Sequence, residues 1–146
     1  MNTYKEILDL LPYKEPFLFV NDLASVNEDG VTGSYTFKLE EDFYRGHFKE
    51  YPVTPGVILT ECCAQIGLVC LGIYLLKKEQ ADFKNPQIAL SSSQMDFLLP
   101  VYPKETVTVS SSLVYFRFHK LKCLVKMHNG NGQLVCQGVL EGMLKI

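Results

Sequence analysis

The sequence lacks the features that mark several common functional classes. Its 146 residues contain no block of lysines and arginines, and a formal net charge of −2 does not favour nucleic acid as a partner. The five cysteines are odd in number and have no paired spacing, so neither a disulfide framework nor a zinc site is indicated. We therefore expect reduced cysteines in a cytoplasmic protein that binds no metal and no nucleic acid.

The chain also lacks internal repeats, low-complexity tracts and linkers. Residues 1–10 show no basic-then-apolar pattern of a signal peptide. With 47% apolar and 21% charged residues, the composition is that of a globular protein large enough to bury its own core. We expect one domain over residues 1–146.

One long apolar run, residues 57–76, is long enough to cross a membrane. It carries Glu61, however, and an ionised carboxylate at bilayer depth is costly and rare. Because the flanking sequence is typical of β structure, we expect a buried core helix and no membrane span.

Hydrophobic patterning and turn residues predict an α+β domain. The predicted elements are a short helix over 3–10, strands over 17–26 and 31–39, the apolar helix, and strands over 87–99, 106–118, 121–128 and 133–144. An apolar helix between two strands and four strands is best buried by an antiparallel β-sheet that wraps around it.

The helix start has its own signature. We expect Thr54 at the N-cap and Pro55 at the first helical position, where the missing N–H has no cost. The N–H of Gly56 then has no intrahelical partner and is supported by the helix dipole. Since glycine has no side chain, a substrate carbonyl could approach this donor closely.

The chemistry-bearing residues lie around this helix start. Among apolar neighbours the pKa of Glu61 should rise, so that its carboxyl can act as an acid near neutral pH. Gln65, one helical turn later, could orient Glu61. His47 in the preceding loop titrates near neutral pH and suits a base. Residue types alone leave this acid/base pair and an ordinary structural role for His47 about equally favoured.

These residues belong to a longer pattern. It comprises Gly46-His47-Phe48, Pro52, Pro55-Gly56-Val57, Glu61 and Ala64-Gln65. The pattern resembles the signature of the 3-hydroxyacyl-[acyl-carrier-protein] dehydratases of the hotdog fold, whose catalytic His and Glu are also fourteen positions apart. Two further segments, 11–20 and 95–103, resemble the start and the later Pro-rich segment of the same family, so the resemblance spans most of the chain.

The resemblance implies a mechanism and an assembly. His47 would take the C2 proton of a (3R)-3-hydroxyacyl thioester, and Glu61 would protonate the departing hydroxyl. Gly56 would hold the thioester oxygen and Gln65 would position Glu61, with Val57 and Phe48 also in the substrate-binding site. No cofactor is needed. The partners would be acyl carrier protein, which carries the acyl chain on phosphopantetheine, and a second copy in a homodimer or a trimer of dimers.

Departures from the family pattern leave the pathway open. Tyr13 replaces a usual histidine, Lys49-Glu50 replaces Pro-Gly, and Lys104-Glu105 replaces Gly-Asp. They favour a specialised member, for example of an aryl polyene pathway, over bulk fatty acid synthesis. The alternatives are a hotdog acyl thioesterase and a non-catalytic acyl-binding subunit. A cysteine nucleophile at Cys62 or Cys63 is a minor alternative, because buried helical cysteines usually act as small apolar residues.

Overall fold

The computed structural model describes residues 3–80 and 85–145. Its helical elements are α1 (Thr3–Leu10), η1 (Asp42–Arg45), α2 (Gly56–Cys63), η2 (Ala64–Val69) and α3 (Cys70–Glu79). Its strands are β1 (Asp22–Asn27), β2 (Gly30–Thr36), β3 (Gln87–Phe97), β4 (Thr106–Arg117), β5 (Lys120–His128) and β6 (Leu134–Lys145). Two strands, one long helix and four strands follow one another as predicted.

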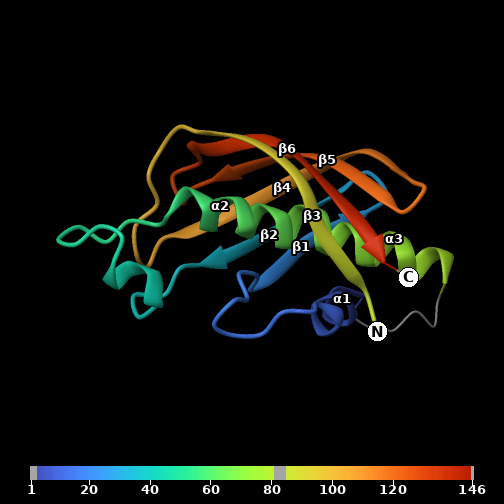
Figure 1. Cartoon of the computed structure of the whole chain (residues 1–146), viewed down its shortest axis with the longest axis horizontal. Helices are drawn as coiled ribbons and strands as arrows, with labels where there is room; N and C mark the ends of the chain where they lie inside the picture. The colour runs from blue at the N-terminus through green and yellow to red at the C-terminus, as the bar shows by residue number, and fades with distance from the viewer. Residues whose placement is uncertain (1–2, 81–84, 146) are drawn as a thin grey trace.

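The strands form one antiparallel sheet of six, in the order β1-β2-β4-β5-β6-β3. The sheet curves around the central helix, which runs along its concave face, while α1 lies beside α3 (Figure 1). This arrangement confirms the expected α+β hotdog fold. In the described part of the chain β3 hydrogen-bonds to β6 alone, so its other side forms an edge of the sheet.

The central helix is continuous from Gly56 to Glu79, but its middle segment, η2, is a π-helix. All six residues of η2 are buried. The helix backbone approaches the sheet closely at Gly67, where an added methyl would lie 2.9 Å from Val125 of β5. In length and hydropathy this helix could cross a membrane, yet 72% of its most apolar window is buried inside the protein. Its apolar surface is therefore covered by the sheet, as expected of a core helix.

The predicted strand over 17–26 is wrong in its first half. β1 begins at Asp22, and residues 17–21 run below the central helix without pairing as a strand. Most of the other predicted boundaries lie within two residues of those in the structure, and β2, which ends at Thr36, differs most. A turn at Asn27 joins β1 to β2, and the Asn27 side-chain oxygen accepts the N–H of Asp29 there at 2.8 Å.

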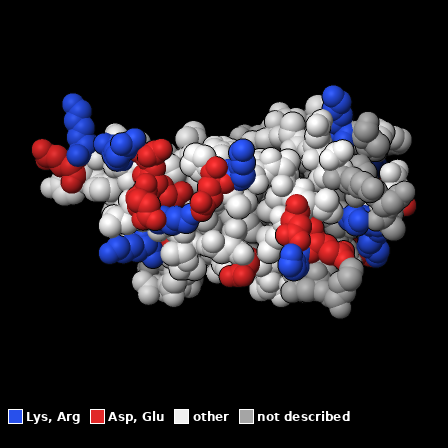
Figure 2. All heavy atoms as spheres, turned by 90° about the horizontal axis from the view of Figure 1, so that it is seen from below, with Lys and Arg blue, Asp and Glu red and all other residues white. Residues whose placement is uncertain are grey.

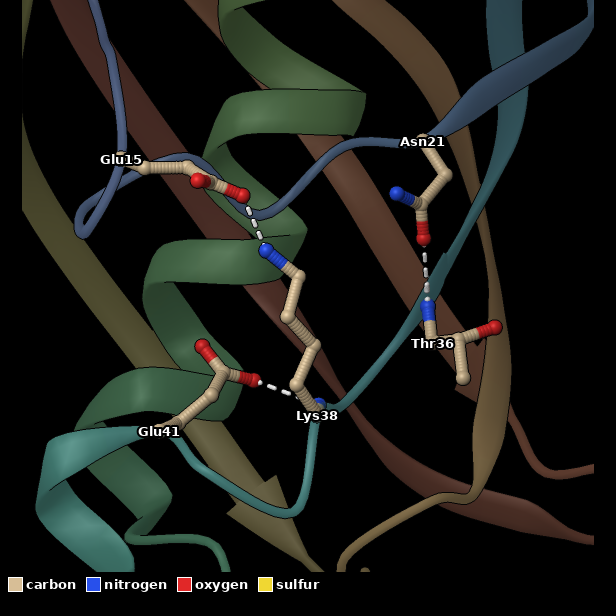
Figure 3. Close-up of polar contacts among 5 residues, drawn as sticks. All are labelled: Glu15, Asn21, Thr36, Lys38 and Glu41. Atoms are coloured by element: carbon tan, nitrogen blue, oxygen red, sulfur yellow. Dashed lines mark hydrogen bonds and ion pairs between the residues drawn. The ribbon is translucent and has the colours of Figure 1, made fainter.

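Polar contacts tie this N-terminal segment to the end of β2 and to the chain that follows it. Asn21 Oδ1 accepts the N–H of Thr36 at 2.7 Å, and Lys38 forms an ion pair with Glu15 (Figure 3). Glu41 Oε2 in turn accepts the Lys38 N–H at 2.9 Å. Together these contacts hold residues 15–21 against the body of the protein, below α2.

Charges of both signs are interspersed on the surface. On the face seen from below, acidic and basic side chains alternate without forming a large patch of one sign (Figure 2). Ion pairs such as Lys5–Asp9 and Arg45–Asp42 lie at exposed positions, where each contributes little to stability.

Gly138 lies where β6 and β3 approach each other closely. A methyl group at this position in β6 would lie 2.1 Å from the backbone oxygen of Gln94 in β3. We expect Gly138→Ala to lower the free energy of unfolding by about 1–3 kcal/mol, because β3 must move away from β6. Gly130→Ala is the control, since nothing lies within 4 Å of the added methyl there. Urea unfolding of both variants tests this, and equal stability of the two would contradict it.

Candidate active site

Gln65 is the centre of a hydrogen-bond network below the second turn of α2. Its side chain is fully buried, and its Nε2 donates to Glu61 Oε2 at 2.9 Å and to the Phe17 carbonyl at 3.1 Å. Its Oε1 accepts the Phe19 N–H at 2.8 Å. Gln65 thus contacts Glu61 one helical turn apart, as the spacing requires, and its role in positioning the acid stays a prediction.

Burial raises the pKa of the Glu61 carboxyl above its ordinary value of 4.5. The cause is loss of hydration around the charged form, and the hydrogen bond from Gln65 acts in the opposite direction. The predicted direction is therefore confirmed. A carboxyl in this state can hold a proton at higher pH than a solvated one and can donate it to a leaving group.

A cavity of about 590 Å³ opens directly beside this carboxyl. It is lined by Gly56, Val57, Thr60, Glu61, Leu90, Ser93, Met95 and Phe97. One wall comes from the start of the central helix and the other from β3. The site thus has one polar group with a raised pKa in a largely apolar lining, which is typical of a small-molecule site.

The β3 wall was not predicted as part of the site. Ser93, Met95 and Phe97 occupy alternate positions of the strand, so alternation could have grouped them on one face. Leu90 breaks this alternation, because the register shifts between Leu90 and Ser92 and turns Leu90 to the same side. A bulge of this kind cannot be read from a single sequence.

The helix start differs from the prediction by one residue. Pro55 is the N-cap, with an extended backbone (φ −59°, ψ 141°), and no side chain caps the helix. The hydroxyl of Thr54 lies 2.6 Å from the hydroxyl of Tyr44 instead. The Ile58 N–H donates to the Pro55 carbonyl at 2.9 Å, whereas the N–H of Gly56, at the cavity wall, receives no side-chain cap and could meet an oxygen in the cavity.

The loop between η1 and α2 projects beyond the sheet (Figure 1), and by its position in the chain His47 belongs to this loop. Its Nδ1 lies 2.9 Å from the Val53 carbonyl, and because a carbonyl only accepts, Nδ1 carries the proton. In the neutral ring Nε2 is then left with its lone pair, the state a base requires. The Phe48 ring stacks on the imidazole at 4.3 Å between centroids.

The structure of one chain brings part of the predicted site together. Gly56, Val57 and Glu61 line the same cavity, and Gln65 supports Glu61 from below. His47 and its neighbour Phe48 are not among the residues that line this cavity. The roles of all six residues remain predictions.

Cys62 and Cys63, the candidate nucleophiles, have the properties of buried structural thiols. All five are free and buried. Burial raises the pKa of the Cys62 thiol, and the hydrogen bond with Cys136, followed by burial, raises that of Cys63. A thiol in this state is a poor nucleophile. Among residues 3–80 and 85–145, no group of His, Cys, Asp and Glu has the arrangement of a metal site.

The fold and the cavity together define a hotdog-fold protein with a small-molecule site. Comparison with known proteins gives its family. The model of the FabA-like domain matches residues 11–139. The 3-hydroxyacyl-[acyl-carrier-protein] dehydratase FabZ of Clostridium perfringens is 31% identical over 142 residues, covering 94% of this chain and 95% of the relative. FabZ of Caldicellulosiruptor bescii is 30% identical over 148 residues, covering 99% and 100%. The chain belongs to the FabA-like family.

Solved structures agree on the fold. The ApeI:P dehydratase heterocomplex of Xenorhabdus doucetiae matches with a TM-score of 0.78 at 12% identity, over 96% of this chain and 91% of that one. A hypothetical thioesterase of Streptococcus pneumoniae with coenzyme A matches with a TM-score of 0.61 at 12% identity, over 85% and 84%. At such low identity these likenesses establish the hotdog fold alone.

The raised pKa of Glu61 has a consequence for stability. The folded chain holds this proton more tightly than the unfolded chain, so the free energy of unfolding falls as pH rises from 4.5 through the folded pKa. Glu61→Gln keeps the shape and an acceptor for Gln65, but it does not ionise. We expect this variant to be more stable than the wild type near pH 7 and equal to it near pH 4. Urea unfolding at both pH values tests this, and a less stable variant near pH 7 would contradict it.

Proposed function

We propose that this chain dehydrates (3R)-3-hydroxyacyl thioesters on acyl carrier protein to trans-2-enoyl thioesters. The observation that carries the proposal is the Glu61 carboxyl, whose pKa is raised, in an apolar cavity beside an uncapped helix start. The FabZ relatives, similar over nearly the whole chain, carry the name of the same reaction.

Each step has a group suited to it. The unprotonated Nε2 of His47 takes the proton from C2, and the resulting enolate oxygen is held by the Gly56 N–H. Electrons from C2 then form the C2–C3 double bond while the 3-hydroxyl leaves with the proton of Glu61 as water. A water molecule afterwards returns a proton from His47 to Glu61. The balance requires no cofactor.

We further propose that two copies pair through the β3 edge as a homodimer, which could assemble further into trimers of dimers. β3 has eleven residues, and its apolar side chains Leu90 and Phe97 are 41% and 48% exposed. A long edge strand with exposed apolar residues invites pairing with another strand. Since the cavity wall includes β3, a second copy there would lie beside the cavity and could bring its His47 to Glu61.

The proposed context is cytoplasmic biosynthesis, either of fatty acids or of a polyketide-type chain such as an aryl polyene. The departures at Tyr13 and Lys49-Glu50 support a specialised member. A panel of (3R)-3-hydroxyacyl carriers with varied length and unsaturation would identify the chain that is used. The thioesterase alternative predicts release of a free thiol from the same panel, and the non-catalytic alternative predicts binding without turnover.

The acid and the base should each be indispensable. We expect His47→Ala and Glu61→Gln separately to lower kcat for enoyl formation by at least about a hundredfold. The absorbance of the enoyl thioester measures this. Cys63→Ala is the control, since a thiol nucleophile at this position would make that variant inactive instead. Full activity of either His47→Ala or Glu61→Gln would overturn the mechanism.

If each active site is shared between two copies, mixing two inactive variants should restore part of the activity. A pair of His47→Ala with Glu61→Gln has one doubly damaged site and one intact site if His47 and Glu61 come from different copies. Random pairing after refolding together should then restore about a quarter of the wild-type activity. No recovery, in samples shown by mass spectrometry to contain mixed pairs, would place both groups of each site in one chain.

A further inference from the structure

Tyr44 and Thr54 join the two ends of the loop that carries His47. Both side chains are buried, with 4% and 5% of their surface exposed, and their hydroxyl oxygens lie 2.6 Å apart. Tyr44 lies three residues before His47, and Thr54 lies two residues before Gly56. The contact therefore links the segment of the proposed base to the segment of the proposed oxyanion donor.

The loop between these two residues is held by its own main chain. The His47 N–H donates to the Phe43 carbonyl at 3.0 Å, and the His47 carbonyl accepts the Val53 N–H at 2.8 Å. Since the His47 ring also contacts the Val53 carbonyl, His47 is held by Phe43 on one side and by Val53 on the other. The Thr54 N–H donates to the Val101 carbonyl at 2.9 Å, which fixes this end of the loop to the body of the protein.

Tyr44 is anchored as well. It belongs to η1, and its ring packs against Phe43 at 4.6 Å between centroids, next to the aromatic residues of the core. Burial raises the pKa of the Tyr44 hydroxyl to about 12, so this group stays neutral at physiological pH and acts only as a hydrogen-bonding partner. Its contact with Thr54 thus joins two segments that are each fixed to the core.

The same contact explains why Thr54 does not cap the helix. A threonine next to a helix start can place its hydroxyl on the first free N–H groups. Here the hydroxyl is turned to Tyr44, and the start of α2 has no side-chain cap. The N–H of Gly56 therefore remains free to meet an oxygen in the cavity.

We propose that Tyr44 and Thr54 are positioning residues for the reaction. Their hydroxyl contact fixes the loop that carries His47 against the start of α2 of the same chain, so each of these groups is held in place for the site it enters, and it keeps the Gly56 N–H uncapped. This inference rests on the proposed function for its kinetic test. Neither residue lines the cavity beside Glu61, so we expect their effect to fall on kcat through the placement of other groups and not on affinity.

The kinetic test is a double-mutant cycle. Tyr44→Phe and Thr54→Val should each lower kcat about tenfold with KM changed less than about twofold. The double variant should be no slower than the slower single variant, because both changes remove one contact. Thr54→Ser keeps the hydroxyl and should restore most of kcat. Tyr115→Phe is the matched control, since it removes a hydroxyl bonded to Glu141 at 3.0 Å in β6 and should leave kcat unchanged.

Two kinetic results would overturn the inference. One is wild-type kcat in both single variants. The other is multiplication of their effects in the double variant, with Thr54→Ser as slow as Thr54→Val. Thermal unfolding of each variant accompanies the kinetics, and a loss of kcat that follows the fall in Tm across all variants, Tyr115→Phe included, would also count against positioning.

A second measurement needs no turnover, so it separates this inference from the proposed function. The nitrogen chemical shifts of His47 report which ring nitrogen carries the proton. We expect the proton on Nδ1 in the wild type and in Thr54→Ser, and a mixture of tautomers in Tyr44→Phe and Thr54→Val, with His119 and His128 unchanged as internal references. Unchanged His47 shifts in both of these last variants would overturn the inference, even if the wild type turned over no substrate.

Discussion

The buried amide of Gln65 is the interaction on which the rest of the site depends. It joins the central helix, the segment through Phe17 and Phe19, and the carboxyl of Glu61. A buried amide without partners destabilises a fold by a few kcal/mol, whereas this one has three. Because the backbone groups of Phe17 and Phe19 hold the amide in place, it favours one position for the Glu61 carboxyl. The polar network that stabilises the core is thus also the network that prepares the acid.

Part of this arrangement could be predicted from the sequence because it follows from local rules. The succession of strands along the chain, the buried helix and the Glu61–Gln65 contact follow from periodicity and helical spacing alone. Phe17 was assigned to a strand because its neighbours are β-formers, but its carbonyl is used by Gln65. Thr54 has the residue type of an N-cap, but a tyrosine ten positions earlier takes its hydroxyl. In both cases a tertiary partner outweighed a local preference.

Neither the residue spacing nor the single folded chain places His47 beside Glu61. Spacing places the two groups on opposite sides of the helix start, and we propose that a second copy completes the site. The described edge of β3 gives that idea a physical basis, because the strand has unpaired backbone groups and exposed apolar side chains next to the cavity. β3 would then serve both as the dimer contact and as a wall of the cavity. A substitution in β3 would therefore have to be compatible with both assembly and catalysis.

The π-helical segment in the middle of the central helix has a consequence for how this chain can vary in length. A π-helical turn accommodates one residue more than an α-helical turn over nearly the same rise. A deletion within Ala64–Val69 could therefore be absorbed by a return to α-helix, leaving α3 in register with the sheet. A deletion within α2 or α3 would instead rotate every later helical residue by about 100° and turn apolar side chains away from the core. Gaps in alignments of relatives across this helix are accordingly expected at η2.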